Sequence, residues 1–197
     1  MTFLVDGTLG GTFPSWTTAT RPASPTVGQM GYNTTTGLFD QYVSSGWQSI
    51  SAGATTGSVL QVVNATYGTR TTSASSTFAD TGLTASITPK FSTSKILVLA
   101  DVDGCGKDTN DTYLQLRLLR GSTTIIDFER LAGYINATGR NFVGACSTSY
   151  LDSPATTSST TYKVQFASGA NNATVYINVD GSGSSPNSTI TLMEIAG

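Results

Sequence analysis

Residues 95–102 have the sequence Lys-Ile-Leu-Val-Leu-Ala-Asp-Val, and this stretch decides the fold. Four consecutive apolar residues, Ile96 to Leu99, leave no polar face, and the run is shorter than a buried helix of about ten residues or more. Its β-branched residues also favour an extended backbone. The stretch therefore predicts a strand that is buried on both faces.

Other strand-sized stretches lie on both sides of this one, and glycine-containing or polar turns separate them. Gly121-Ser122 lies between two of them and predicts a tight β-hairpin. Residues 112–120 have a helical alternative, because their leucines would share one helix face, but the Gly-Ser turn and the strand-like neighbours favour a strand. The expected strands cover residues 59–67, 77–87, 113–119, 123–128, 141–150, 161–167, 173–179 and 188–195.

A succession of short strands without a helical period predicts an all-β fold, an antiparallel β-sandwich of jelly-roll-like form. Residues 1–50 are expected to form a short extended N-terminal arm with a small β-hairpin region, which docks or anchors the protein. Pro14, Pro22 and Pro25 fix φ and predict irregular extended chain over residues 12–28. Residues 51–57, Ser-Ala-Gly-Ala-Thr-Thr-Gly, predict a flexible linker, and residues 58–197 the sandwich body.

The composition narrows the classes of function. Only 11% of residues are charged and the net charge is -2, so the chain lacks the basic face that nucleic-acid binding requires. Ser and Thr make up about three residues in ten, which suits the exposed positions of strands. The chain has no histidine, the commonest general base and zinc ligand, so we expect no enzyme activity and no cofactor.

The beginning of the chain lacks the basic and apolar regions of a signal peptide, and no apolar run is as long as a membrane span. We therefore expect synthesis in a cytosol and no membrane partner. Cys105 and Cys146 are then expected to be reduced, although the sequence leaves open whether they pair.

Asp101, Asp103 and Asp108 form the one weak candidate for a metal site. Aspartates at the first and third positions with Gly106 at the sixth resemble a calcium loop. The twelfth position holds Thr112 where a bidentate glutamate is needed, so a polar loop whose side chains cap turns is the favoured interpretation and no metal is expected.

Aromatic residues are the main candidates for partner docking. The first fifty residues are too few to hide all of them, so we expect these rings to pack either on the protein's own body or on another subunit or docking surface, where Trp and Tyr serve as anchors. The candidates are Phe3, Phe13, Trp16, Tyr32, Phe39, Tyr42 and Trp47.

Three stretches resemble segments of virion proteins of tailed bacteriophages. They are TRPASPTVGQMGYNTTTGLFDQY at residues 20–42, continuing to Trp47, GSVLQVV at residues 57–63, and DTGLTASITP at residues 80–89, continuing to SKILV at residues 94–98. Similar bodies occur in capsid decoration (cement) proteins and in distal domains of tail fibres and tailspikes, particularly of phages of cyanobacteria. The resemblance covers about residues 20 to 100.

This resemblance implies a homotrimer of β-sandwich subunits. It implies a cement protein on the outer capsid surface of the virion, bound to the major capsid protein with its body outward. The alternative is a tail-fibre or receptor-binding tip that binds host-surface glycans. The chain has neither the heptads nor the repeats of a fibre shaft, which favours the cement protein.

Overall fold

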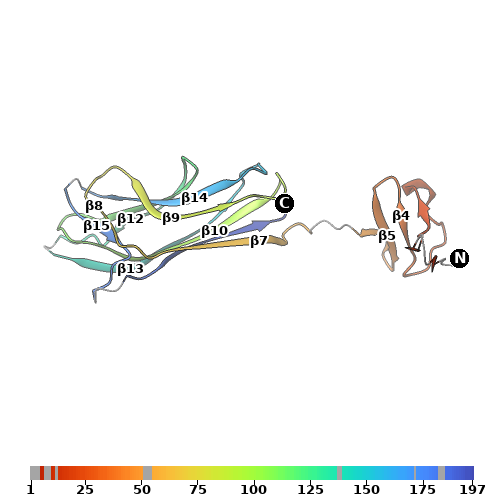
Figure 1. Cartoon of the computed structure of the whole chain (residues 1–197), viewed down its shortest axis with the longest axis horizontal. Helices are drawn as coiled ribbons and strands as arrows, with labels where there is room; N and C mark the ends of the chain where they lie inside the picture. Colours follow the sequence, from red (N-terminus) through yellow and green to blue (C-terminus); the bar gives the residue numbers. More distant parts are fainter. Residues whose placement is uncertain are drawn as a thin grey trace. The chain divides into compact units, whose positions relative to one another are not determined.

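The computed structural model describes residues 5–6, 10–11, 13–50, 55–136, 139–170, 172–181 and 185–197. The chain divides into two compact units, Met1–Ala54 and Thr55–Gly197, which we describe separately. Both are built from strands, as the sequence predicts (Figure 1). In the described part of the chain, no helix has the length and apolar character needed to cross a membrane.

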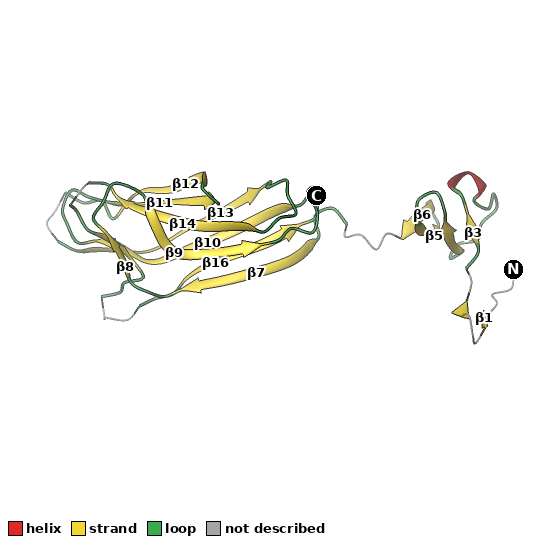
Figure 2. Cartoon of the chain, turned by 45° about the horizontal axis from the view of Figure 1, so that its top comes forward, coloured by secondary structure: helices red, strands yellow, loops and turns green. Residues whose placement is uncertain are grey.

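The body is a sandwich of two antiparallel sheets (Figure 2). One sheet has six strands: its four long strands have the order β7-β16-β10-β13, and the short strands β15 (Val175–Ile177) and β8 (Thr71–Ser73) extend it beside the end of β10. The four strands of the other sheet have the order β12-β11-β14-β9. Without the two short strands, the remaining eight, numbered one to eight along the chain, give the orders 1-8-3-6 and 5-4-7-2, which is jelly-roll topology. The strands are β7 (Val59–Tyr67), β9 (Ala79–Ile87), β10 (Lys95–Lys107), β11 (Leu114–Arg120), β12 (Thr123–Ala132), β13 (Asn141–Asp152), β14 (Thr160–Ser168) and β16 (Ser188–Ile195).

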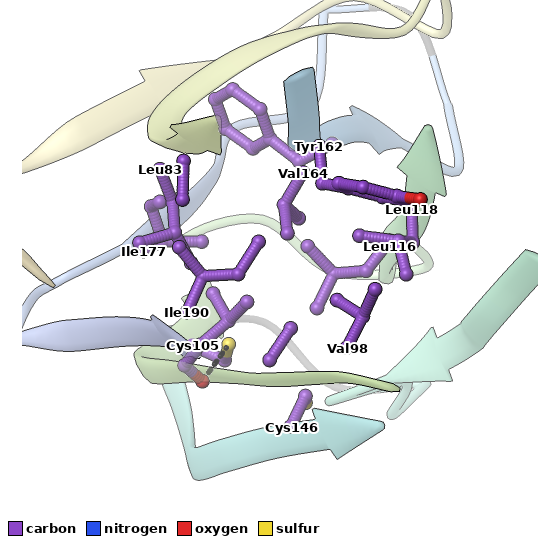
Figure 3. Packing of buried hydrophobic residues seen from close by; sticks show 14 of the residues in the cluster. Leu83, Val98, Cys105, Leu116, Leu118, Cys146, Tyr162, Val164, Ile177 and Ile190 are labelled. Carbon is purple, nitrogen blue, oxygen red and sulfur yellow. Dashed lines mark hydrogen bonds between the residues drawn. The ribbon is translucent and has the colours of Figure 1, made fainter. Parts of the chain in front are cut away.

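The core lies between the two sheets, because alternate residues of each strand point inward. On β9 the buried positions include Leu83, Ala85 and Ile87. Figure 3 shows side chains from both sheets, among them Val98 and Leu116, filling the space between them. Cys105 and Cys146 are buried as free thiols, and the Cys105 thiol donates to the Val102 carbonyl at 3.1 Å.

Most predicted strands are confirmed, and the three differences are a shortened strand, an added strand and a lengthened strand. Residues 112–120 contain strand β11 and the hairpin closes through Arg120 and Thr123, so the helical alternative is wrong. The strand predicted at 173–179 is only β15 (Val175–Ile177), because Asn178 has a φ of 54° and ends it. Strand β8 (Thr71–Ser73), which pairs with β15, was not anticipated.

Strand β10 is the third difference, since it continues past residue 102 to Lys107. Two β-bulges around Cys105 let it remain paired with β13 over nearly its whole length. The interpretation of residues 101–111 as a polar loop is therefore wrong up to Lys107, because Asp101 and Asp103 lie in a strand, whereas residues 108–111 do form a loop.

The N-terminal unit contains a four-stranded sheet of order β3-β4-β5-β6: Ser15–Trp16, Met30–Asn33, Leu38–Val43 and Gly46–Ile50. Strand β3 runs parallel to β4, and the others are antiparallel. Strands β1 (Val5–Asp6) and β2 (Gly10–Gly11) form a separate pair. A short 3-10 helix, Thr18–Thr20, lies where irregular chain was predicted, because Thr17 and Thr20 cap it reciprocally.

Candidate functional site

A buried carboxylate organises the N-terminal unit. Asp40, on β5, has no exposed side-chain surface. Its Oδ2 accepts hydrogen bonds from Trp16 Nε1 at 3.2 Å, Arg21 Nε at 2.9 Å and Asn33 Nδ2 at 2.8 Å. Its Oδ1 accepts from Ser49 Oγ at 2.8 Å. The four donors come from distant positions in the sequence, so the hydrogen bonds of this one side chain connect segments from residue 16 to residue 49.

Burial alone would raise the pKa of Asp40, because it disfavours the charged form. The hydrogen bonds from Arg21, Ser49, Asn33 and Trp16 outweigh burial and lower the pKa to about 2. The carboxylate is therefore ionised and fully bonded at neutral pH, which suits a structural part and not a proton donor or acceptor in catalysis.

Two more aromatic rings lie with Trp16 on the face of the sheet that carries Asp40. The ring centroids of Trp16 and Trp47 are 5.0 Å apart, and those of Tyr42 and Trp47 are 5.4 Å apart, both edge to face. Trp16 is buried and packs against Gly31, where a Cβ atom would overlap its ring. These rings form the unit's small core.

The opposite face of the sheet exposes a second group of apolar side chains. Cross-strand pairing places Tyr32 beside Phe39 and Phe39 beside Ile50. Phe39 lies edge to face with Phe13 at 5.1 Å and with Tyr32 at 5.6 Å. We call this surface the aromatic face; its members, which are between 36% and 47% exposed, are Phe13, Met30, Tyr32, Phe39 and Ile50.

The polar neighbours of the aromatic face carry no charge. Gln41 pairs with both Met30 and Gln48 across the strands, and Ser15 pairs with Tyr32. The surface is thus a contiguous apolar and aromatic patch with a neutral polar rim, which is the composition of a protein interface core. The charged groups of the unit's network, Arg21 and Asp40, belong to the other face.

The structure thus divides the predicted docking residues into two groups. Trp16 is buried and packs with the half-buried rings of Tyr42 and Trp47, whereas Phe13, Tyr32 and Phe39 are exposed on the aromatic face. Phe3 lies outside the described residues. Met30 and Ile50 were missed, although the alternation of Met30 with Tyr32 is a period-two signal that was available in the sequence.

The weak metal candidates do not come together as a ligand set. The Asp101 carboxylate accepts from Ser147 Oγ at 2.6 Å, that of Asp103 from Gly104 N at 2.7 Å, and that of Asp108 from Arg140 Nε at 2.6 Å. Among the residues that the structure describes, no group of three His, Cys, Asp or Glu side chains is placed to hold a metal ion.

Two other buried carboxylates hold the body together in the same manner. Both carboxylate oxygens of Asp152 accept a hydrogen bond from Arg120 Nη1, Oδ1 at 2.9 Å and Oδ2 at 2.8 Å. Oδ2 also accepts one from the Tyr162 hydroxyl at 2.7 Å. Glu194 accepts from Gln61 Nε2 at 2.6 Å and from Lys90 N at 2.7 Å. Burial would raise the pKa of Glu194, but these bonds outweigh it and lower the pKa.

Comparison with known proteins gives only a slight likeness. No protein-family model matches the chain, and no curated protein matches it. T=1 particles derived from infectious bursal virus match with 12% identity and a TM-score of 0.37, over 90% of this chain and 50% of that one. A mutant VP2 protein of infectious bursal disease virus, also as derived T=1 particles, matches with 13% identity and a TM-score of 0.36, over 88% and 50%. The chain spans half the length of these proteins, and at such TM-scores the likeness carries no argument about function.

Proposed function

We propose that this chain is a structural virion protein that works without catalysis, as a homotrimeric cement protein on the outer capsid surface of a tailed bacteriophage. Made in the host cytoplasm, it binds the major capsid protein through its N-terminal unit and directs its body outward. Each trimer would bridge neighbouring shell subunits and so add interface area that resists internal pressure.

The aromatic face of the N-terminal unit is the observation that carries this proposal. A separate unit that is built around a fixed polar network presents five large apolar side chains to solvent on one side. Aromatic side chains that become fully buried against a partner are the usual anchors of an interface. Among the described residues, no charged side chain of this sheet face would have to be desolvated when it docks on an apolar patch of the shell.

Two further features support a structural role. The sequence resembles phage virion proteins over about residues 20 to 100. The buried carboxylates Asp40, Asp152 and Glu194 are each held by several donors, an arrangement that stabilises a fold.

Particle binding by point variants of the full chain tests the proposal. Ile50→Asp puts a charge on the aromatic face, whereas Ser45→Asp puts the same charge in the exposed β5–β6 turn. We expect Ile50→Asp to lower the number of copies bound per particle at least about tenfold, because the new carboxylate would be buried unpaired, and Ser45→Asp to bind like the wild type. Equal binding by both variants would contradict docking through this face.

The number of copies per native particle distinguishes the two virion positions. Quantitative mass spectrometry of purified particles is expected to give a ratio to the major shell protein near that of a decoration protein. A few copies per particle would place the chain in the tail, and its absence from particles would overturn the virion proposal.

One observation favours the alternative function, a tip that binds host-surface glycans. At the end of the body where β10 terminates, Tyr134 and Phe142 are about half exposed. The Arg140 guanidinium lies 5.7 Å from the Phe142 ring and forms an ion pair with Asp108. Flat rings beside hydrogen-bonding groups suit sugar recognition. Binding of the full chain to host polysaccharide, with Phe142→Ala as the weakened variant, tests this alternative.

A further inference from the structure

The outer faces of the two body sheets differ in chemistry. The β12-β11-β14-β9 sheet presents charged and amide side chains to solvent. Lys163 Nζ forms an ion pair with Asp80 at 2.9 Å, and Arg117 donates to Gln165 Oε1 through two nitrogens. The Arg117 guanidinium also lies 4.1 Å from the centre of the Phe78 ring. The outer face of this sheet is therefore charged and polar, as expected of a surface that remains exposed to solvent.

The β7-β16-β10-β13 sheet instead presents an apolar row. Its register places Val62 beside Met193, Met193 beside Leu97, and Leu97 beside Leu151, so one row crosses all four strands. Val62 is 55% exposed and Leu151 is 53% exposed. The next row contains Leu99 among Asn64, Thr191 and Ser149. We call this surface the apolar sheet face; it comprises Val62, Leu97, Leu99, Leu151 and Met193.

The edges of the sheets show the same contrast. The edge strand β7 has no charged residue, and β13 has none from Asn141 to Leu151. The edge strands of the other sheet carry Asp80 on β9 and Asp127, Glu129 and Arg130 on β12. Charged residues on edge strands are a usual protection against unwanted pairing. The sheet with the apolar face is therefore also the sheet whose edges lack this protection.

We propose that copies of this chain bind one another through the apolar sheet face and its flanking edges β7 and β13. The inference rests on the proposed homotrimer and names the surface that forms it. Charged side chains on this face are confined to its ends, Lys95 at one and Asp101 and Asp103 at the other. A neutral centre is best matched by an equally neutral surface, because a charged partner would be left with a buried, unpaired charge. A second copy offers such a surface.

The exposed side chains of the body indicate which sheet faces the other copies and which sheet faces water. With the apolar sheet face turned toward the other copies, the charged β12-β11-β14-β9 sheet remains in water. The aromatic face belongs to the other unit, so self-association and docking are assigned to different surfaces.

A charge placed in the row tests the inference on the full chain, without particles. The wild type is expected to sediment as a trimer, three times 20.4 kDa or about 61 kDa. Leu151→Asp should raise the trimer dissociation constant by about a hundredfold or more, because the carboxylate would be buried between subunits. Ser86→Asp, at an exposed position of β9 on the charged sheet, is the matched control and should remain a trimer.

Val62→Asp, at the other end of the row, provides a second variant if Leu151→Asp fails to fold, as far-UV circular dichroism would show. A wild type that sediments as a 20.4 kDa monomer overturns self-association. A folded Leu151→Asp or Val62→Asp that stays trimeric, or a Ser86→Asp that dissociates equally, overturns this surface. A monomeric wild type would also remove the homotrimer from the proposed function. Particle binding, which Ile50→Asp tests, would still be decided separately, and a folded trimeric variant would refute this surface alone.

Discussion

Replacement of Asp40 by alanine is expected to unfold the N-terminal unit while the body stays folded. The change leaves two buried donors, Trp16 Nε1 and Asn33 Nδ2, without their acceptor. Each such loss costs about 1–3 kcal/mol. It also leaves the Arg21 guanidinium, whose side chain is 23% exposed, without its carboxylate. Breaking a buried ion pair on one side costs about 3–5 kcal/mol.

These costs overlap, so a total loss of about 4 kcal/mol is expected. A core as small as this one supplies no more than about 3–5 kcal/mol of stability. The Asp40→Ala unit should therefore be largely unfolded at 25 °C. The body has its own core and should be unaffected, because the two units are compact separately.

The chain provides its own selective probe for this experiment. Both of its tryptophans, Trp16 and Trp47, lie in the N-terminal unit, so tryptophan emission reports that unit alone. Far-UV circular dichroism reports mainly the body, which holds most of the strands. The emission of Asp40→Ala should shift to the red in buffer, whereas the thermal midpoint measured by circular dichroism should not move.

Asp127→Ala is the matched control, because Asp127 pairs with Arg130 on an exposed edge, where the side chains are 41% and 70% exposed. Such pairs contribute about 1 kcal/mol or less. Wild-type emission and an unchanged urea midpoint for Asp40→Ala would refute the view that the carboxylate network holds the unit together.

Two other predictions use the same readouts, and a third uses thiol labelling. The pKa of Asp40 is lowered to about 2, so its ionisation stabilises the folded unit by about 2 kcal/mol above pH 4, and this effect is lost as the pH falls toward 2. The urea midpoint measured by tryptophan emission should therefore fall between pH 4 and pH 2. It should fall less in Asp40→Asn, which has no carboxyl group to protonate. Gly31→Ala puts a methyl group against the Trp16 ring and the Pro14 carbonyl. The free energy of unfolding measured by tryptophan emission should therefore drop by about 1–3 kcal/mol, without a change in the body's thermal midpoint. Contact with Cys146 and burial raise the pKa of the Cys105 thiol, which is fully buried. Iodoacetamide at pH 8 should therefore label Cys105 only in denaturant, as measured by peptide mass spectrometry. Labelling of Cys105 in the native protein would contradict the packing described.

The body was predictable because its strands obey simple periodicities. Alternation on β9 and the apolar run from Ile96 to Leu99 each indicate a strand without reference to the rest of the chain. Where the prediction was wrong, a local conformational detail decided the outcome. The left-handed backbone of Asn178 ends β15, and the bulges around Cys105 carry β10 through a segment that resembles a loop.

The N-terminal unit was less predictable because its core is polar at the centre. Asp40 lies between Phe39 and Gln41, and nothing in that local sequence indicates burial. Its donors at positions 16, 21, 33 and 49 come together only when the sheet has formed. The sequence therefore indicated an aromatic-rich segment, but not which rings form its core and which are exposed.

The placement of charge connects the two units' proposed roles. In a chain with 11% charged residues, ion pairs lie inside networks, as with Arg21 and Asp40 or Arg120 and Asp152, or on the charged sheet and the polar loops. The aromatic face has no charged side chain, and the apolar sheet face has none at its centre. A protein that must remain soluble before assembly yet bury both surfaces afterwards needs neutral polar groups on their rims, since each buried unpaired charge would weaken the interface. Those positions hold Ser15, Gln41 and Gln48 on the aromatic face. On the apolar sheet face they hold Asn64, Ser149 and Thr191. Neutral polar side chains on both rims are what we expect of assembly through two neutral faces.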